Sequence, residues 1–483
     1  MGGATNDTGY GDEDYLAFSA RMREQLEWLR RHLKSGALDE APASLGAELE
    51  LYILDHQARP LARNLELLER ADHPALQVEL NRFNLEYNLP PVHCAGHPFS
   101  TCIERVEEQL AHLNVLAAEM QGQVAAVGIL PTLRIEDFNE CMTSSPRYHA
   151  LAENLRKIRG EPFRIHIRGR GGEVQAVCDD VSLEGANSSW QTHLRVGARH
   201  FAAWFNAIQL VTPLVLGVSG NSPLLFGRSL WEETRVALFR QSIDSRSPHA
   251  AGWRQPARVS FGEGWLRRGA WEHFAEAVAL YPPIIPECAT APIETLSELR
   301  LHTGTVWHWN RPVYDPVDGG HLRIEMRALP AGPSAVDMAA GSAFLVGAAN
   351  ALRPEIERLM AALPFRYCER NFVSAARDGL QAKVIWPCTT QVELFERALP
   401  DIVLELLPRA REGLEALGVD AGEARRQCEL IRARVESRQT GSVWMRRALE
   451  RLGGGEEATM EMMQHYLRHQ AGHRPVHEWE LPS

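Results

Sequence analysis

Residues 45–54, Leu-Gly-Ala-Glu-Leu-Glu-Leu-Tyr-Ile-Leu, alternate between apolar and polar side chains along most of their length. Successive side chains of a β-strand point to opposite faces of its sheet, so the odd-numbered positions share an apolar face while Glu48 and Glu50 share the other. Like charges side by side are unfavourable, and such a pair requires a cation or contact with solvent. The stretch predicts a strand with one face in a core. Taken alone, it favours a solvated carboxylate face over a ligand site.

A second pair of carboxylates, Glu79 and Glu86, lies in residues 77–91. The two positions have opposite parity, so one uninterrupted strand cannot direct both side chains into a single site. Either the backbone breaks between Asn81 and Asn84, because asparagine suits turns, or one of the two glutamates is structural. The sequence leaves both alternatives open.

A third stretch, residues 190–196, places Gln191, His193 and Arg195 on one face of a predicted strand. A lone histidine is more often a surface or core residue than a metal ligand. His193 becomes a candidate ligand because it would share a sheet with the carboxylates.

The fourth stretch, residues 321–329, predicts a strand with Arg323, Glu325 and Arg327 on its polar face. A structural ladder of ion pairs would show the same pattern. The functional alternative is that Glu325 binds a metal ion while the two arginines neutralise phosphate oxygens, a role that suits the guanidinium fork. Because a site with many oxygen ligands suits Mg²⁺ or Mn²⁺ and two ions can clamp a transferring phosphoryl group, we expect two or more ions.

The order of predicted elements indicates an α+β fold with an antiparallel or mixed sheet. We expect an N-terminal helix within residues 1–40, a catalytic domain over 41–364 and a helical region over 365–483. Further strands are predicted at 163–168 and helices at 102–121, 145–159 and 197–214. In the C-terminal region the predicted helices are 391–405, 408–417, 421–437, 443–452 and 458–470, and the boundary near Phe365 marks either a subdomain or a helical layer on the sheet.

Composition restricts the class of protein. The chain has 483 residues, 45% apolar and 23% charged, with a net charge of -11, which is typical of a globular enzyme and argues against nucleic acid as a partner. The eight cysteines form no C-x-x-C pair, so neither zinc nor a disulfide framework is indicated. The first residues do not resemble a signal peptide, and the apolar run at 207–218 is too short to span a bilayer. We expect a cytoplasmic protein that does not bind membranes.

Five motifs occur in an order that resembles the bacterial glutamate-cysteine ligase and carboxylate-amine ligase family, which shares the fold of glutamine synthetase. They are Gly-Ala-Glu-Leu-Glu (46–50), Glu79 with Glu86, Gln-Thr-His (191–193), Gly-Asn-Ser-Pro (220–223) and Leu-Arg-Ile-Glu-Met-Arg (322–327). Residues 128–132 and 142–148 also fit. The resemblance implies a glutamine synthetase-like domain with a curved sheet flanked by helices.

The resemblance also implies residue roles. The metal ligands would be Glu48, Glu50, Glu79, Glu86, His193 and Glu325, and the catalytic residues in contact with phosphate would be Arg323 and Arg327. Candidate substrate-binding residues are Gln191, Arg235, Trp307 and Arg311. Trp307 and Arg311 lie in the stretch 302–312, where aromatic side chains could instead serve packing, and Arg235 could be an ordinary exposed helix arginine.

The activity implied is ATP-dependent formation of an amide through an acyl phosphate, with glutamate and cysteine as the small-molecule substrates. The alternatives are a ligase of the same fold that acts on another acid and amine, in a peptide or a specialised metabolite, and a nucleotide-binding relative without turnover. Neither a Walker-type phosphate loop nor an H-E-x-x-H motif occurs in the sequence. A homo-oligomer is compatible with this assignment.

Overall fold

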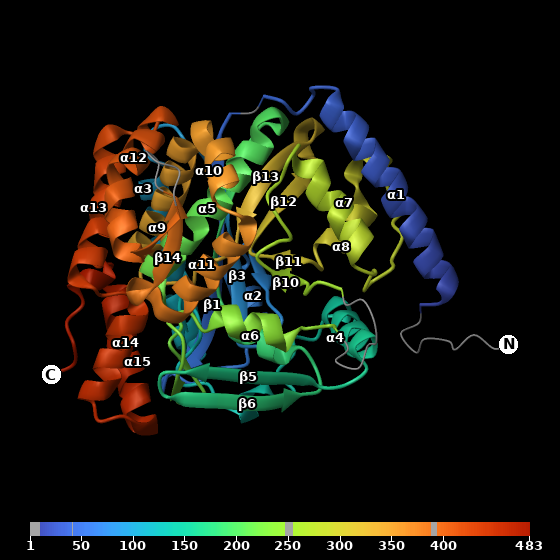
Figure 1. The fold of residues 1–483 in the computed structure, drawn as a ribbon. Helices are drawn as coiled ribbons and strands as arrows, with labels where there is room; N and C mark the ends of the chain where they lie inside the picture. Colours follow the sequence, from blue (N-terminus) through green and yellow to red (C-terminus); the bar gives the residue numbers. More distant parts are fainter. Residues whose placement is uncertain (1–9, 41, 247–254, 388–393) are drawn as a thin grey trace.

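A computed structural model describes residues 10–40, 42–246, 255–387 and 394–483. At its centre lies a seven-stranded sheet in the order β12-β13-β7-β1-β3-β2, with β4 also paired to β1 (Figure 1). All of these pairings are antiparallel, and the sheet is curled. The strands are β1 (Ser44–Asp55), β2 (Leu76–Val78), β3 (Asn84–His93), β4 (Gly122–Ala125), β7 (Trp190–Arg195), β12 (Asn310–Asp315) and β13 (His321–Met326). The predicted α+β class with a curved antiparallel sheet is confirmed.

The apolar face of the sheet is buried under helices, as the alternation in residues 45–54 predicts. Leu49 and Leu51 are fully buried on this face. On β7, the Trp190 indole Nε1 donates to Ser342 Oγ over 2.7 Å, which ties the same face to α9 (Ala335–Leu352). The polar face, with Glu48 and Glu50, is therefore directed away from this helical layer.

The helical layer beside the sheet consists of α5 (Phe201–Ser219) and α9, with α3 (Pro98–Glu119), α12 (Leu399–Ala416) and α13 (Ala421–Ser437) packed around α9 (Figure 1). The helical segments Ala198–Ser219 and Ala335–Ala362 are long and apolar enough to cross a membrane, with mean hydropathies of 1.6 and 1.4, but 89% of each apolar stretch is buried inside the protein. They are core helices of this fold.

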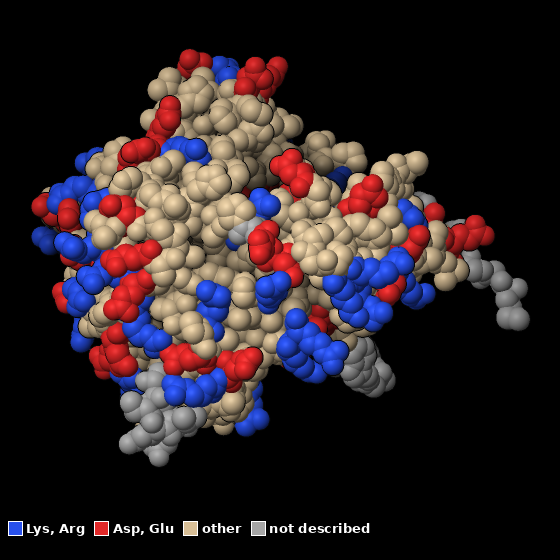
Figure 2. All heavy atoms as spheres, turned by 90° about the horizontal axis from the view of Figure 1, so that it is seen from above, with Lys and Arg blue, Asp and Glu red and all other residues tan. Residues whose placement is uncertain are grey.

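The remaining elements before residue 364 include a group of helices around the N-terminal helix (Figure 1). The predicted N-terminal helix is α1 (Asp12–Lys34), which packs against α7 (Ala270–Leu280) and α8 (Ser297–Thr303). The other elements before residue 364 are α2 (Asn64–Ala71), α4 (Pro146–Arg159), α6 (Arg235–Ser242), α10 (Ile356–Ala362), and the short pairs β5 (Phe163–Gly169) with β6 (Gly172–Cys178), β8 (Leu224–Leu225) with β9 (Arg228–Ser229), and β10 (Val259–Ser260) with β11 (Trp307–His308). Basic and acidic side chains are interspersed on the face shown in Figure 2.

The C-terminal region is helical as predicted, with two corrections. A hairpin of β14 (Lys383–Pro387) and β15 (Leu394–Ala398) follows α11 (Phe365–Asp378), so the predicted helix 391–405 is wrong at 394–398; its residues 391–393 lie outside the described ranges. The predicted break at Pro408 is also wrong, because α12 continues through this proline. Its buried side chains, among them Leu399, Leu407 and Leu414, hold the helix against the core on both sides of the proline.

The last helices are α13, α14 (Gly441–Arg451) and α15 (Gly455–Ala471), in agreement with the predictions. Buried side chains of α12 and α13 belong to the same apolar cluster as those of β1 and α9. In the described residues this region is thus a helical layer on a shared core. The domain boundaries at 40 and 364 remain predictions.

Candidate active site

The register of the sheet gathers the predicted polar residues on one face. The directly opposed residues are Glu50 with Glu86, Glu48 with Gln191, His193 with Glu325, and Glu325 with Arg311. Side chains of directly opposed residues lie within contact distance on the same face of the sheet. Strands distant in sequence therefore place carboxylates, one imidazole and guanidinium groups side by side.

Two adjoining cavities open over this face, with volumes of about 330 Å³ and 210 Å³. The larger is lined by Glu50, Glu79, Glu86, Gln191, Trp307 and Arg327, together with residues of α4 and of the turn before β7. The smaller is lined by His193, Arg323 and Glu325. Glu48 and Arg311 line both.

The backbone breaks between Glu79 and Glu86, as one of the two alternatives from the sequence required. β2 ends at Val78 and β3 begins at Asn84. Between them the Asn81 side chain donates to the Ser182 carbonyl over 2.9 Å, which fixes the turn. Both glutamates consequently face the larger cavity.

Among the described residues, no cationic side chain forms an ion pair with the carboxyl groups of Glu50, Glu79 and Glu86. Their carboxylate oxygens lie within 4.8 Å of one another. Burial, and then the neighbouring Glu86, raises the pKa of Glu50 to about 7, and burial, and then Glu48, raises the pKa of Glu86 to about 7. Burial, and then Glu86, Glu50 and Glu184, raise the pKa of Glu79 well above its ordinary value. A divalent cation between these oxygens would replace the protons that the group otherwise retains, so the residues present fit an ion such as Mg²⁺.

The group of Glu48, His193 and Glu325 is compact as well, with ligand atoms within 4.8 Å of one another. Arg323 Nε donates to His193 Nδ1 over 3.0 Å, so a neutral ring carries its proton on Nε2. That nitrogen lies 3.0 Å from Glu48 Oε1. His193 thus links a guanidinium to a carboxylate in this arrangement, and a metal ion at Nε2 would have to displace the proton.

Glu325 is held between two guanidinium groups. Arg311 donates to it through Nε and Nη2 over 2.7 and 3.0 Å, and Arg327 Nη1 also donates to it. Burial raises the pKa of Glu325, but Arg311 and Arg327 outweigh burial and leave that pKa well below its ordinary value. This carboxylate is therefore ionised and already neutralised, unlike the other carboxylate group.

One N–H donor of Arg327 has no hydrogen-bond partner among the described residues. Its Nη1 also donates to Gln191 Oε1 over 2.7 Å, whereas its Nε is buried and has no hydrogen-bond partner among the described residues. An unsatisfied buried donor costs about 1–3 kcal/mol. Arg327 lines the larger cavity, so a small movement of its guanidinium would let this donor reach an oxygen of a bound anion.

Comparison with known families identifies the chain. The model of glutamate-cysteine ligase family 2 matches residues 44–469. The chain belongs to this family. It is accordingly a carboxylate-amine ligase, and the resemblance found in the sequence is confirmed.

Comparison with solved structures agrees on the fold. The crystal structure of a glutamate-cysteine ligase from Francisella tularensis in complex with AMP superposes with a TM-score of 0.50 at 12% identity, covering 92% of this chain and 91% of that chain. A bifunctional glutathione synthetase from Pasteurella multocida gives 0.44 at 13% identity over 93% of this chain and 55% of that one. The ligase PafA, solved with the ubiquitin-like protein Pup, gives 0.41 at 12% identity over 90% and 73%. A search of curated proteins found no match.

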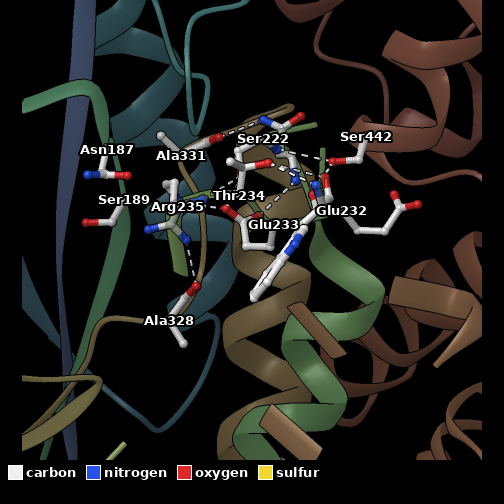
Figure 3. A network of polar contacts seen from close by, with 12 residues as sticks. Asn187, Ser189, Ser222, Glu232, Glu233, Thr234, Arg235, Ala328, Ala331 and Ser442 are labelled. Carbon is white, nitrogen blue, oxygen red and sulfur yellow. Dashed lines mark hydrogen bonds and ion pairs between the residues drawn. The ribbon is translucent and has the colours of Figure 1, made fainter. Parts of the chain in front are cut away.

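Of the candidate substrate-binding residues in the ligase, Arg235 lines neither cavity and belongs to the polar network drawn in Figure 3. Its side chain is buried, with Nε donating to Glu233 Oε1 over 2.8 Å and Nη2 to the Ala328 carbonyl over 2.7 Å. It is thus neither positioned to anchor a substrate carboxylate nor an exposed helix arginine. It joins the start of α6 to the chain that follows β13.

The cavity of the ligase also contains residues that sequence reasoning missed. Glu184, in the turn Ser182–Ala186, lines the larger cavity, and burial, and then Glu50, raises its pKa to about 8. No strand periodicity marks this position. Arg147 and Tyr148, at the start of α4, line the same cavity. They fall within residues 142–148, where the family resemblance alone gave an indication.

Proposed function

We propose that the ligase joins glutamate to cysteine with ATP and Mg²⁺ or Mn²⁺ and forms γ-glutamylcysteine. Family membership supports the amide-forming chemistry. The observation that carries the proposal is that one cavity contains both a cluster of three carboxyl groups and Arg327, whose buried Nε has no partner among the described residues. A nucleotide phosphate with a divalent cation would satisfy both.

Each group has a role in this scheme. Glu50, Glu79 and Glu86 would hold a divalent ion, and a second ion at Glu48, His193 and Glu325 would have to displace the proton on His193 Nε2. A bound ion supplies positive charge to the phosphate oxygens. Arg327 would donate to the transferring phosphoryl group, and Arg323 and Arg311 would keep His193 and Glu325 oriented. Trp307 and Gln191, in the cavity wall, would contact the substrates.

The reaction then has two steps. A carboxylate oxygen of glutamate attacks the γ-phosphorus of ATP, the bond to ADP breaks, and an acyl phosphate forms. The amine nitrogen of cysteine attacks the acyl carbon, phosphate leaves, and the nitrogen loses a proton. Charge develops on oxygen in both steps, and preorganised donors such as Arg327 stabilise it.

ADP release measured with glutamate alone, cysteine alone and both together tests the proposal, with the product identified by mass spectrometry. We expect release that depends on both amino acids and a product with the mass of γ-glutamylcysteine. Arg327→Ala should lower release by at least about 100-fold, the order seen when one transition-state donor is removed. Arg377→Ala, at an exposed position on α11, is the matched control and should retain activity.

Release with another acid or amine in a substrate panel would reassign the substrates. Nucleotide binding without any turnover would identify a relative that has lost catalysis. Full activity of Arg327→Ala would remove this residue from the site.

A further inference from the structure

A separate cluster of potential metal ligands lies behind the cavity wall, in residues to which the sequence analysis gave no metal-binding role. His273 and Glu276 are three positions apart on α7, so they share one face of the helix. His308, the second residue of β11, meets them, and the ligand atoms of the three side chains lie within 4.8 Å of one another. The adjacent Trp307 side chain lines the larger cavity.

The hydrogen bonds of His308 select its tautomer. Tyr281 donates its hydroxyl proton to the Ala257 carbonyl over 3.3 Å, so its oxygen is left to accept from His308 Nε2, also 3.3 Å away. With the proton on Nε2, the lone pair is on Nδ1. Nδ1 is buried and has no partner among the described residues, and the side chain is 1% exposed.

This arrangement is typical of a metal-binding histidine, whose second nitrogen is usually held by an outer hydrogen bond. Packing alone accounts for part of the cluster, since the His273 ring lies edge-on to Phe205 at 5.1 Å. Packing does not satisfy the buried Nδ1 of His308, whose ring lies 4.9 Å from that of His273, centroid to centroid.

We infer that His273, Glu276 and His308 form a binding site for a transition-metal ion, best suited to Zn²⁺. Two imidazoles and one carboxylate are a zinc ligand set with a fourth position for water, whereas the carboxylate group of the cavity suits Mg²⁺. Ligand atoms on one tetrahedral zinc lie about 3.3 Å apart, so the side chains would close inward from their present separation. Glu276 is partly exposed, which gives the ion a route from solvent.

Bound at this place, the ion would clamp α7 to β11 behind Trp307. It would position the cavity wall and take no part in the reaction. The inference therefore stands independently of the proposed function.

Zinc retained by the full-length protein after desalting, measured by plasma mass spectrometry in excess Mg²⁺, tests the site. We expect about one zinc per chain. Glu276→Gln and His308→Gln should weaken zinc binding by more than about 100-fold, and Tyr281→Phe by about 10–100-fold, as for an outer partner. His149→Gln, an exposed histidine on α4, should retain the zinc.

Glu325→Gln is the second control, because Glu325 is not among the three proposed zinc ligands, and the variant should retain the zinc although it also loses the charge that pairs with Arg311 and Arg327. A wild-type protein without tight zinc, or stoichiometric zinc in Glu276→Gln, would overturn the inference. Loss of zinc in Glu325→Gln with retention in Glu276→Gln would move the ion to the cavity. Glu276→Gln, a near-isosteric change at a partly exposed position, decides the matter even where His308→Gln fails to fold.

Discussion

At the scale of the residue, Arg311 fixes the orientation of the Glu325 carboxylate at the cavity. Its guanidinium fork grips both carboxylate oxygens, a geometry that lysine cannot reproduce. Arg311→Lys should cost about 1.5–3 kcal/mol, the value of a hydrogen bond to a charged group, which corresponds to about 10–100-fold in kcat/KM. Steady-state ADP release measures this effect.

Arg300→Lys is the matched control for this prediction. Arg300 lines the smaller cavity but its side chain is exposed, so the same exchange should change kcat/KM by less than about threefold. Equal losses in the two variants would mean that charge at the cavity, and not the fork on Glu325, is what Arg311 supplies.

From the sequence, the sheet face on which a side chain lies is easier to predict than the residue that the side chain contacts. Parity along each strand placed Glu48 with Glu50 and Arg323 with Glu325, and the structure brings both pairs to the cavities. Strand order is not encoded in parity, so the grip of Arg311 on Glu325 from the neighbouring strand could not be foreseen. Arg235 shows the same limit, because the Ala328 carbonyl that accepts from it lies 93 residues further along the chain.

At the scale of the element, α9 and α12 cross at two glycines. A Cβ atom at Gly413 would lie 2.0 Å from the Gly347 carbonyl oxygen, and one at Gly347 would lie 2.3 Å from the Ala410 carbonyl oxygen. Backbone contacts this close leave no room for a methyl group. We expect Gly413→Ala to destabilise the fold by about 2 kcal/mol, since overpacking costs about 1–3 kcal/mol and exceeds the helix-propensity gain.

Equilibrium unfolding in urea measures this loss, with Gly264→Ala as the control. A Cβ atom at Gly264 meets nothing within 4 Å, so its effect should stay within about 0.5 kcal/mol. A stable Gly413→Ala protein would show that the two helices can separate without loss.

Helices could be predicted where the spacing of apolar residues along the segment is enough to specify a helix. Residues 421–437 match α13 at both ends, where the Asp420 side chain caps the first turn by accepting from the Glu423 amide. Pro408 was placed at a boundary because proline disfavours a helix interior, but buried contacts along α12 override that preference. Pairing of β15 with β14 is likewise tertiary, and the local sequence does not reveal it.

At the scale of the whole molecule, a buried ion pair connects the C-terminal region to the core. Arg434 of α13 donates to Asp337 Oδ1 of α9 over 2.7 Å, and the Val476 amide donates to Asp337 Oδ2 over 2.9 Å. Both charged side chains are nearly inaccessible, at 1% and 3% exposed. Since the apolar cluster is also continuous across residue 364, the two predicted parts should unfold as one unit.

Arg434→Met tests this unity, because it leaves the Asp337 charge buried without its counter-charge, at a cost of about 3–5 kcal/mol. Hydrogen exchange followed by mass spectrometry should show the amides of β1 and β7 losing protection together with those of α13 and α14, by a similar free energy. Arg432→Met, on the same helix but with an exposed side chain, should change neither set. If only the amides after residue 364 exchanged faster in Arg434→Met, the C-terminal helices would be a separate unit, which is one of the two alternatives that the sequence left open. Equal loss in both sets would instead mean that those helices hold the sheet, and hence the cavity, in place.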